Sequence, residues 1–343
     1  DPAREHVRIP PLISPYNPTL APALKRYSDF AARSCAMLQG GRRVADVAVL
    51  YPIAAAQAGF RFGGGDEWGE SAPPELDYQR VGALLTTVLH RDYTLVHPEM
   101  LTDGRVRPEG RTMLLDNRVN RQRYDVLILP GGKVFSAEAL GRVRERGGRV
   151  IATSCLPERS AEFGMDDALR SEVEALFGSP SERRAGTIRR NGAGGAAVFV
   201  PEPDARSLER AFAALEADPD VVIADTARHA GSGTSFGYLT KMVASEQEAS
   251  ASDPTGGNGA SFCYIHKQKD GRDIYFFTNS SNDSISTPVS LRGRLKLQRW
   301  DPFTGETTGL ASRRERRSGG TYTHFELDLP PVSGVFVVGE RRE

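Results

Sequence analysis

The sequence of 343 residues has little cysteine, no excess of either charge and no long apolar run. Its three cysteines, Cys35, Cys155 and Cys263, are widely spaced and odd in number, which supports neither a disulfide framework nor a zinc cluster. Lys and Arg together number 44, as do Asp and Glu, so the whole chain has no electrostatic bias toward nucleic acid or an anionic membrane. No stretch approaches the ~18 continuous apolar residues that a membrane span needs. We therefore expect a globular protein that has neither nucleic acid nor a membrane as its partner.

Clear signals for phosphate, metal or glycosidase chemistry are also missing. The glycine runs at 63–65 and 192–195 lack the Lys-Ser/Thr pair and the strand–loop–helix setting of a phosphate loop, so we interpret both as turns. His90 and His97 flank an expected strand without further ligands at metal spacing, which favours structural roles. Glycosidase chemistry needs two carboxylates that face one sugar across ~5 to 10 Å, and the sequence identifies no such pair. No metal or cofactor site is predicted within these residues.

The beginning of the chain does not resemble a natural start. The sequence opens on Asp1 without a signal peptide and continues at once into an apolar, proline-punctuated stretch at residues 9–18. Such a stretch is typical of the middle of a folded element. We expect the chain to be part of a longer protein; a whole protein with a processed N-terminus is the alternative.

An α/β pattern follows an amphipathic helix expected at 24–38. The expected strands are short, nearly continuous apolar runs, as in a buried parallel sheet. They are expected at 44–52, 93–96, 112–115, 124–130, 149–153, 196–200 and 220–223. Helices are expected at 78–89, 136–146 with Ser136 as N-cap, 166–177 and 204–215. This alternation predicts fold class α/β, with right-handed βαβ units in a largely parallel sheet of flavodoxin-like type.

After residue 260 the pattern changes to short strands separated by turns. A stretch rich in Ser, Gly, Ala and Glu at 244–259 precedes it and is expected to be a linker. Strands are expected at 262–266, 273–278, 287–291, 295–300, 321–327 and 334–338. Pro288 lacks an amide hydrogen, so its strand is expected at an edge. Together these strands predict a small antiparallel β-sandwich.

Two neighbouring motifs resemble those of class I glutamine amidotransferases and DJ-1-like proteins. The strand expected at 124–130 leads into Gly131-Gly132, and the strand expected at 149–153 leads to Cys155. In those families the first motif supplies backbone N–H donors and the second a nucleophilic cysteine on a sharp turn. Such a turn needs small residues after the cysteine, whereas Leu156-Pro157 follow here, and no His–Glu pair lies at the downstream spacing of a triad. We expect the fold to be retained and the chemistry lost, with an active Cys155 as the alternative.

Two other places are candidates for contact with a sugar. In Asp66-Glu67-Trp68 the indole face has the right chemistry to stack on a pyranose, while the carboxylate of Glu67 could bind hydroxyl groups. An ordinary exposed loop can contain the same residues. Tyr51 follows the first strand of the α/β pattern, at the edge where such sheets bind ligands. Substrate contact by Tyr51, Glu67 and Trp68 is therefore a hypothesis.

Three segments, in order, resemble an arrangement found in large glycoside hydrolases. They are 27–52, with Leu38-Gln-Gly and a strand ending in Tyr51-Pro52; 140–152, with Gly147-Gly148; and 271–306, with Trp300-Asp-Pro-Phe-Thr-Gly. The segments are similar to those of family-106 α-L-rhamnosidases. The barrel-plus-amidotransferase layout of some β-galactosidases is a more distant match.

This resemblance implies a division of the chain. Residues 1–43 would end a catalytic (β/α)8 barrel, 44–243 would form an amidotransferase-like α/β domain, 244–259 a linker and 260–343 the β-sandwich. It also implies an inverting mechanism with two glutamates upstream of residue 1, and a calcium ion near the sugar in the full-length enzyme. His6, Tyr16 and Asn17 would follow the last barrel strand, whose C-terminal end faces the active site, and could contact substrate.

The function expected is that of a C-terminal accessory part of a bacterial glycoside hydrolase, packed on its upstream barrel. The expected substrate is a carbohydrate with an O-glycosidic bond, and terminal α-L-rhamnosides follow from the resemblance alone. The alternatives are a free-standing amidotransferase- or DJ-1-like enzyme that uses Cys155, and a non-catalytic carbohydrate-binding module. The compartment stays open, and a soluble periplasmic or secreted enzyme is consistent with the sequence.

Overall fold

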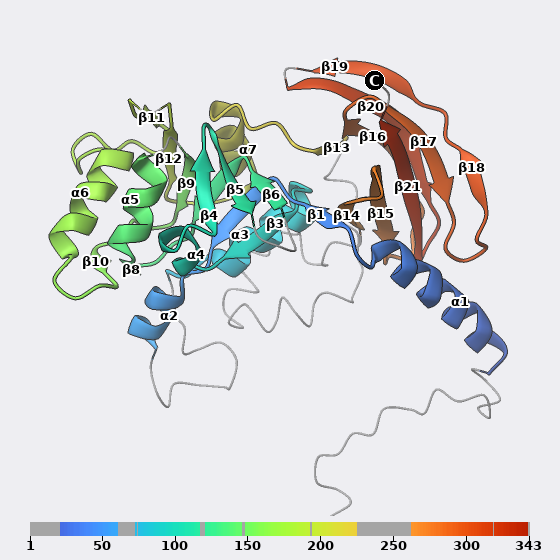
Figure 1. Ribbon diagram of the computed structural model, residues 1–343, viewed down its shortest axis with the longest axis horizontal. Helices are drawn as coiled ribbons and strands as arrows, with labels where there is room; N and C mark the ends of the chain where they lie inside the picture. The colour runs from blue at the N-terminus through green and yellow to red at the C-terminus, as the bar shows by residue number, and fades with distance from the viewer. Residues whose placement is uncertain are drawn as a thin grey trace, which may run out of the picture.

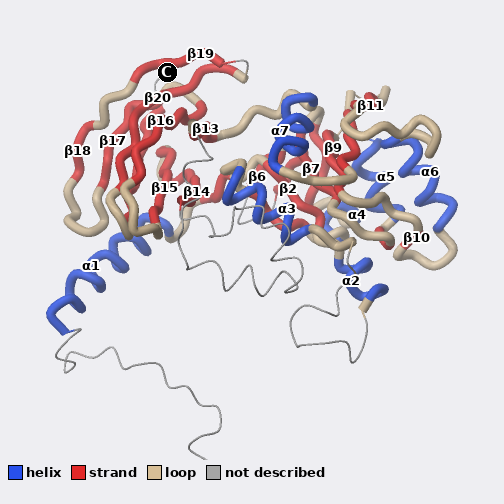
Figure 2. Tube along the Cα trace, turned by 180° about the vertical axis from the view of Figure 1, so that it is seen from behind, coloured by secondary structure: helices blue, strands red, loops and turns tan. Residues whose placement is uncertain are grey.

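The computed structural model describes residues 21–60, 73, 75–116, 121–145, 148–192, 194–224, 262–317 and 319–341. These residues form an α/β domain and a β-sandwich, which lie side by side in Figure 1. Helix α1 (Ala21–Leu38) packs on the sandwich, although it comes before the α/β domain in the sequence. The two views show the same division, with helices concentrated in one body and antiparallel strands in the other (Figure 2).

A six-stranded sheet in the order β11-β12-β9-β7-β2-β3 forms the centre of the α/β domain. Its strands are β2 (Val47–Leu50), β3 (Tyr93–Val96), β7 (Val126–Leu129), β9 (Arg149–Thr153), β11 (Ile188–Arg190) and β12 (Ala196–Val200). All are parallel except β11, which is antiparallel to β12. The chain starts at β2, adds β3 on one side and then β7, β9 and β12 in turn on the other, as in a doubly wound α/β fold. The predicted α/β architecture is confirmed.

Helices cover both faces of this sheet because its strands carry apolar side chains on both faces. In β2, Val47 and Val49 pack with one set of helices, while Ala48 and Leu50 pack with the other. The first set is α3 (Tyr78–Ala83), its π-helical continuation η2 (Leu84–Val88) and α7 (Ala205–Ala214). The second set is α4 (Glu99–Thr102), α5 (Ala137–Glu145) and α6 (Asp166–Phe177). All four helices that the sequence predicted in this region are present.

Smaller elements surround the sheet. They are α2 (Ile53–Gly59), the antiparallel sheet β4 (Val106–Glu109), β5 (Thr112–Asp116) and β6 (Arg121–Tyr124), and the parallel pair β8 (Val134–Phe135) and β10 (Arg159–Ser160). Several of them emerge near the carboxyl ends of the central strands and shape that edge. None of the helices in the described ranges combines the length and the apolarity that a membrane crossing requires.

The sandwich consists of two antiparallel sheets, β1-β14-β15-β21-β17-β18 and β13-β16-β20-β19. Their strands are β1 (Arg42–Val44), β13 (Val221–Ile223), β14 (Phe262–Lys269), β15 (Arg272–Asn279), β16 (Ile285–Arg292), β17 (Leu295–Trp300), β18 (Thr307–Gly309), β19 (Arg313–Arg317), β20 (Gly320–Leu329) and β21 (Ser333–Arg341). Buried side chains of both sheets, among them Phe277 and Phe325, form the core between them. On the outer face of the first sheet, Met37 and Leu38 of α1 pack against Phe336. This outer face is apolar because α1 covers it.

Strand pairing crosses the domain boundaries that the sequence suggested. Of the strand expected at 44–52, residues 47–50 form β2 of the parallel sheet, whereas Val44 ends β1, which pairs with β14 of the sandwich. The strand expected at 220–223 in the α/β pattern is β13, which pairs with β16. Two short strands from outside residues 260–343 therefore complete the sandwich.

The prediction that Pro288 places its strand at an edge is wrong, because β16 lies between β13 and β20. The carbonyl of Pro288 accepts a hydrogen bond from the N–H of Ala224 at 3.1 Å. In an antiparallel pair the N–H and C=O of one residue point to the same neighbour. The N–H that Pro288 lacks would therefore point beyond Ile223, the last residue of β13. The proline thus removes no hydrogen bond between β13 and β16.

Candidate functional site

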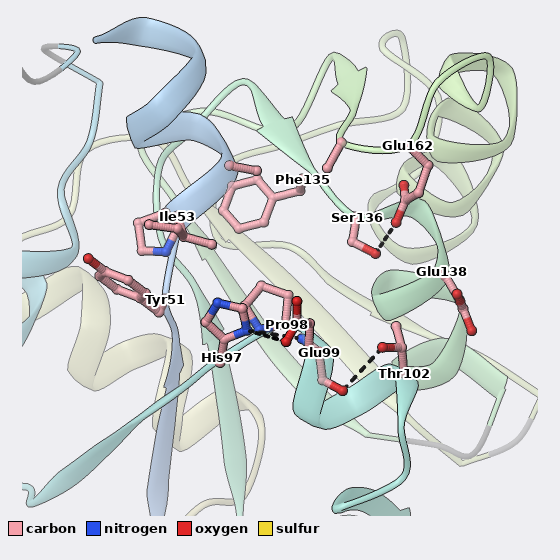
Figure 3. A pocket seen from close by; sticks show the side chains of 13 residues that line it. Tyr51, Ile53, His97, Pro98, Glu99, Thr102, Phe135, Ser136, Glu138 and Glu162 are labelled. Atoms are coloured by element: carbon pink, nitrogen blue, oxygen red, sulfur yellow. Dashed lines mark hydrogen bonds and ion pairs between the residues drawn. The ribbon is translucent and has the colours of Figure 1, made fainter.

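A cavity of about 250 Å³ opens at the carboxyl edge of the parallel sheet (Figure 3). Its walls come from the segments after β2 and β3 and from the turns around β8 and β10. This is the edge at which open α/β sheets bind ligands, close to the point where the strand order reverses. The polar and aromatic side chains in its walls are Tyr51, His97, Glu99, Thr102, Phe135, Ser136, Glu138 and Glu162.

Tyr51 is the sequence-predicted residue that this cavity contains. It directly follows β2, and its backbone N–H donates to the carbonyl of Val96 at 2.8 Å, which extends the pairing with β3. Its ring meets that of Tyr78 edge-on, with centroids 5.7 Å apart. The ring is thus held at the rim of the cavity and partly exposed, as a contact with substrate would require. Contact with a sugar stays a prediction.

His97 also lines the cavity, although the sequence suggested only a structural role for it. Its Nδ1 accepts a hydrogen bond from the N–H of Glu99 at 3.4 Å, at the start of α4. The Glu99 carboxylate lies 3.8 Å from the same nitrogen. In the neutral ring, an accepting Nδ1 places the proton on Nε2. The side chain therefore has a structural contact at one nitrogen and a potential donor at the other.

Glu162 is a fixed anion at the far wall. Its carboxylate accepts hydrogen bonds from the hydroxyls of Ser136 and Ser160, and from the N–H of Ala137 at 2.9 Å, at the start of α5. Burial alone would raise the pKa of Glu162, but these hydrogen bonds together bring it below its usual value. Ser136 also accepts from the N–H of Ala139 at 3.0 Å, so the predicted N-cap is confirmed. Glu162 stabilises the helix start and is unsuited to donate a proton near neutral pH.

The described residues around this cavity contain no glycosidase pair. A general acid in such an enzyme is a carboxyl group whose surroundings raise its pKa. Glu162 has the opposite shift, and the side chains of Glu99 and Glu138 are 78% and 55% exposed. None of these three carboxylates therefore has the surroundings of a general acid. Across the described ranges, no three His, Cys, Asp or Glu side chains come together as metal ligands.

The turn after β9 resembles a nucleophile elbow, but its strained residue is Ser154 and not Cys155. Ser154 has φ +53°, in the left-handed region that few non-glycine residues adopt. Its hydroxyl donates to Asp77 Oδ2 at 2.6 Å, and the N–H of Gly131 donates to Asp77 Oδ1 at 2.6 Å. A Cβ on Gly131 would lie 2.2 Å from the carbonyl oxygen of Glu75, so the close approach requires glycine.

The surroundings of Cys155 disfavour its thiolate form. Burial is the main cause that raises its pKa, and the carboxylates of Glu75 and Asp77 add to it. Its Sγ accepts the N–H of Gly132 at 3.2 Å. The two N–H donors that an amidotransferase-like site would offer to a reacting oxygen are therefore engaged by Asp77 and by Cys155 itself. These contacts favour the interpretation of a retained fold without its chemistry; the role of Cys155 stays a prediction.

The groups with the largest pKa shifts lie at the junction of the two domains, and sequence reasoning missed them. His266 on β14 contacts Asp220 through Nδ1 at 2.6 Å and Asp273 through Nε2 at 3.1 Å. Burial would lower the pKa of His266, but the two aspartates raise it to about 9. Burial raises the pKa of Asp46 to about 6, although Arg91 lies 3.3 Å away and acts in the opposite direction. No local pattern marks these pairs, since each joins residues from different elements.

The remaining sequence-predicted contacts lie outside the described residues. These are His6, Tyr16, Asn17, Glu67 and Trp68.

The fold is similar to parts of glycosidases of known structure. A rhamnosidase from Novosphingobium sp. PP1Y matches with a TM-score of 0.61 at 20% sequence identity, over 94% of this chain and 25% of its own length. A β-galactosidase from Bacillus circulans sp. alkalophilus matches with a TM-score of 0.51 at 11% identity, over 93% of this chain and 44% of its own. This chain thus spans less than half the length of either enzyme. No protein-family model and no curated protein sequence matches it.

Proposed function

We propose that this chain is the C-terminal region of a longer glycoside hydrolase whose catalytic carboxylates lie upstream of residue 1. The observation behind the proposal is the likeness, over 94% of this chain, to a quarter of a rhamnosidase. A fragment with this role needs no catalytic pair of its own. This agrees with the cavity, where Glu99 and Glu138 are exposed and hydrogen bonds lower the pKa of Glu162. The α/β domain, for which we propose a flavodoxin- and amidotransferase-like relationship, would support the upstream domain.

The finer proposal is that the longer enzyme cleaves terminal α-L-rhamnosides. The sequence motifs of family-106 enzymes and the structural match to a rhamnosidase support this substrate class. The cavity at the carboxyl edge would then contribute to sugar binding. Aromatic faces stack on pyranose rings, and the partly exposed Tyr51 provides such a face beside polar groups.

The test is a comparison of the longer polypeptide with residues 1–343 on a panel of chromogenic aryl glycosides. Turnover of the aryl α-L-rhamnoside by the longer polypeptide alone is expected. Turnover of another aryl glycoside alone would reject the rhamnoside and keep the hydrolase. Inactivity of both, together with sugar affinity in residues 1–343, would favour the carbohydrate-binding module.

A further inference from the structure

A second cavity, of about 360 Å³, lies where the two domains meet. On the sandwich side it is lined by β1 and by Gln268 near the end of β14, and on the α/β side by β6 and Leu114. β1 and β6 are neighbours at the centre of Figure 1. The volume falls in the range of ~300 to 1,000 Å³ that is typical of small-ligand sites.

Arginine dominates the lining of this cavity. The described residues of its lining include Arg42, Arg43, Arg121 and Arg123 and no carboxylate. Two of these arginines have ion pairs: Arg43 contacts Asp92 through two nitrogens, and Arg123 lies 2.8 Å from Glu109.

Among the described residues, neither Arg42 nor Arg121 forms an ion pair. Asp116 lies opposite Arg121 in the β5–β6 pairing but contacts Arg107, at 3.4 Å, so neither guanidinium has a carboxylate partner within the described part of the chain. An anion bound in this cavity would supply the opposite charge that these two guanidinium groups lack.

Arg42 is held in place by a chain of hydrogen bonds. Its Nε donates to Gln268 Oε1 at 2.9 Å, and the Gln268 amide nitrogen donates to Asp273 at 2.7 Å. Asp273 is buried and is fixed in turn by Arg341, at 2.9 Å, and by His266. Arg42 also donates to the carbonyl of Arg121 at 3.5 Å, which links the two arginines. A guanidinium that is oriented in advance loses less entropy when it binds a ligand.

We propose that this cavity binds the anionic group, a carboxylate or a sulfate ester, of an acidic carbohydrate. The planar guanidinium fork matches both groups through two parallel hydrogen bonds. The anion follows from the arginines of the cavity, whereas the carbohydrate rests on the proposed function. Arg42 and Arg121 would bind the ligand directly, and Gln268 would be a positioning residue.

Calorimetric titration of residues 1–343 at low ionic strength tests this inference. The probes are galacturonate, galactose 6-sulfate, neutral galactose and inorganic sulfate. Binding of at least one acidic sugar, and none of galactose at the same concentration, is expected. Whichever acidic sugar binds identifies the source of the anion. Equal binding of galactose, or binding of inorganic sulfate but of neither acidic sugar, would overturn the proposal, as would the absence of any binding.

Arginine variants test whether the acidic sugar binds in this cavity. The double variant Arg42→Gln/Arg121→Gln is expected to lower the affinity for the acidic sugar at least tenfold. Arg142→Gln/Arg170→Gln removes the same charge from exposed sites on α5 and α6 and should leave affinity unchanged. The single variant Arg121→Gln changes an exposed residue and should therefore fold normally. It should still lower the affinity severalfold. Equal loss in the control, or none in the cavity variants, would reject the site.

The two proposals fail separately. If the longer polypeptide hydrolyses an aryl α-L-rhamnoside but this cavity binds no acidic sugar, the inference is rejected and the proposed function stands. If this cavity binds an acidic sugar but the longer polypeptide hydrolyses no glycoside, the proposed catalytic function is rejected and the anion site stands.

Discussion

Ser154 is a residue at which backbone strain and a side-chain contact oppose each other. A left-handed conformation costs a non-glycine residue about 1 to 2 kcal/mol, while a hydrogen bond to a charged group contributes about 1.5 to 3 kcal/mol. Ser154→Ala keeps the strain and loses the bond to Asp77, whereas Ser154→Gly loses the bond but relieves the strain. We predict that the alanine variant is the less stable of the two by about 1 kcal/mol in urea unfolding. Equal stabilities would show that φ at this position is not strained.

The thiols provide a second test at the residue scale. Cys35 is exposed, whereas burial raises the pKa of Cys155 and of Cys263. Because the thiolate is the reactive form, Cys35 should be labelled first by a thiol reagent at neutral pH. The fast phase should disappear in Cys35→Ser and persist in Cys155→Ser. Labelling of Cys155 as fast as Cys35 would restore the amidotransferase- or DJ-1-like reading.

The sequence allowed the edge position of Tyr51 to be predicted, because an apolar run that ends in a turn marks the end of a buried strand. It did not allow His97, Asp77 or His266 to be assigned. His266 contacts Asp220, 46 positions away, and Ser154 contacts Asp77, 77 positions away. Such pairs depend on how distant elements dock, and single-sequence patterns do not contain that information.

At the scale of elements, the start of helix α7 is determined by residues that are close together in the sequence. Asp204 accepts the N–H of Ser207 at 2.6 Å, and the Ser207 hydroxyl accepts the N–H of Asp204 at 2.9 Å, which together form a capping box. Asp204→Ala should cost about 1 kcal/mol at pH 7, measured by urea unfolding. Glu209→Ala, on the exposed face of the same helix, is the matched control and should change stability little.

The effect of Asp204 should depend on pH. The Ser207 hydrogen bonds lower the pKa of Asp204 below its ordinary value of 3.8, so the carboxylate contributes stability above pH 3.8. That contribution is lost as the pH falls through the lower pKa of the folded state. The difference between wild type and Asp204→Ala should therefore shrink at pH 2.5. A difference that is the same at both pH values would contradict a charged cap.

Elements with strong local signals were predicted and those with weak signals were not. Helix α6 begins and ends where the sequence suggested, at Asp166 and Phe177, because apolar residues recur at helical spacing. In contrast, β1 and β13 have three residues each, and their partners lie far away in the sequence. Short strands acquire their sheet from tertiary pairing, which explains why the sequence did not predict β1 as a strand and placed β13 in the α/β pattern.

At the scale of the whole molecule, the domain junction should respond to pH. The folded-state pKa of His266 is raised from 6.5 to about 9, so its contribution to stability is complete below pH 6.5 and is lost as the pH rises through 9. The contribution is roughly 3 kcal/mol. The free energy of unfolding should fall between pH 6.5 and 8.5 in wild type.

This fall should be absent from His266→Gln, which is expected to be less stable at pH 6.5 because Asp220 and Asp273 lose their cationic partner. His97→Gln removes an imidazole that is 41% exposed and should retain the wild-type pH dependence. The measurement is the urea midpoint across this pH range. The same slope in His266→Gln as in wild type would show that other groups are responsible.

The central claim is that catalysis belongs to residues outside this chain. Its most direct test is the rate at which residues 1–343 and the longer polypeptide hydrolyse an aryl α-L-rhamnoside, measured side by side at equal concentration. We predict turnover by the longer polypeptide and a rate no different from buffer for residues 1–343. Hydrolysis by residues 1–343 alone would contradict the claim, because it would require a catalytic carboxylate pair within them.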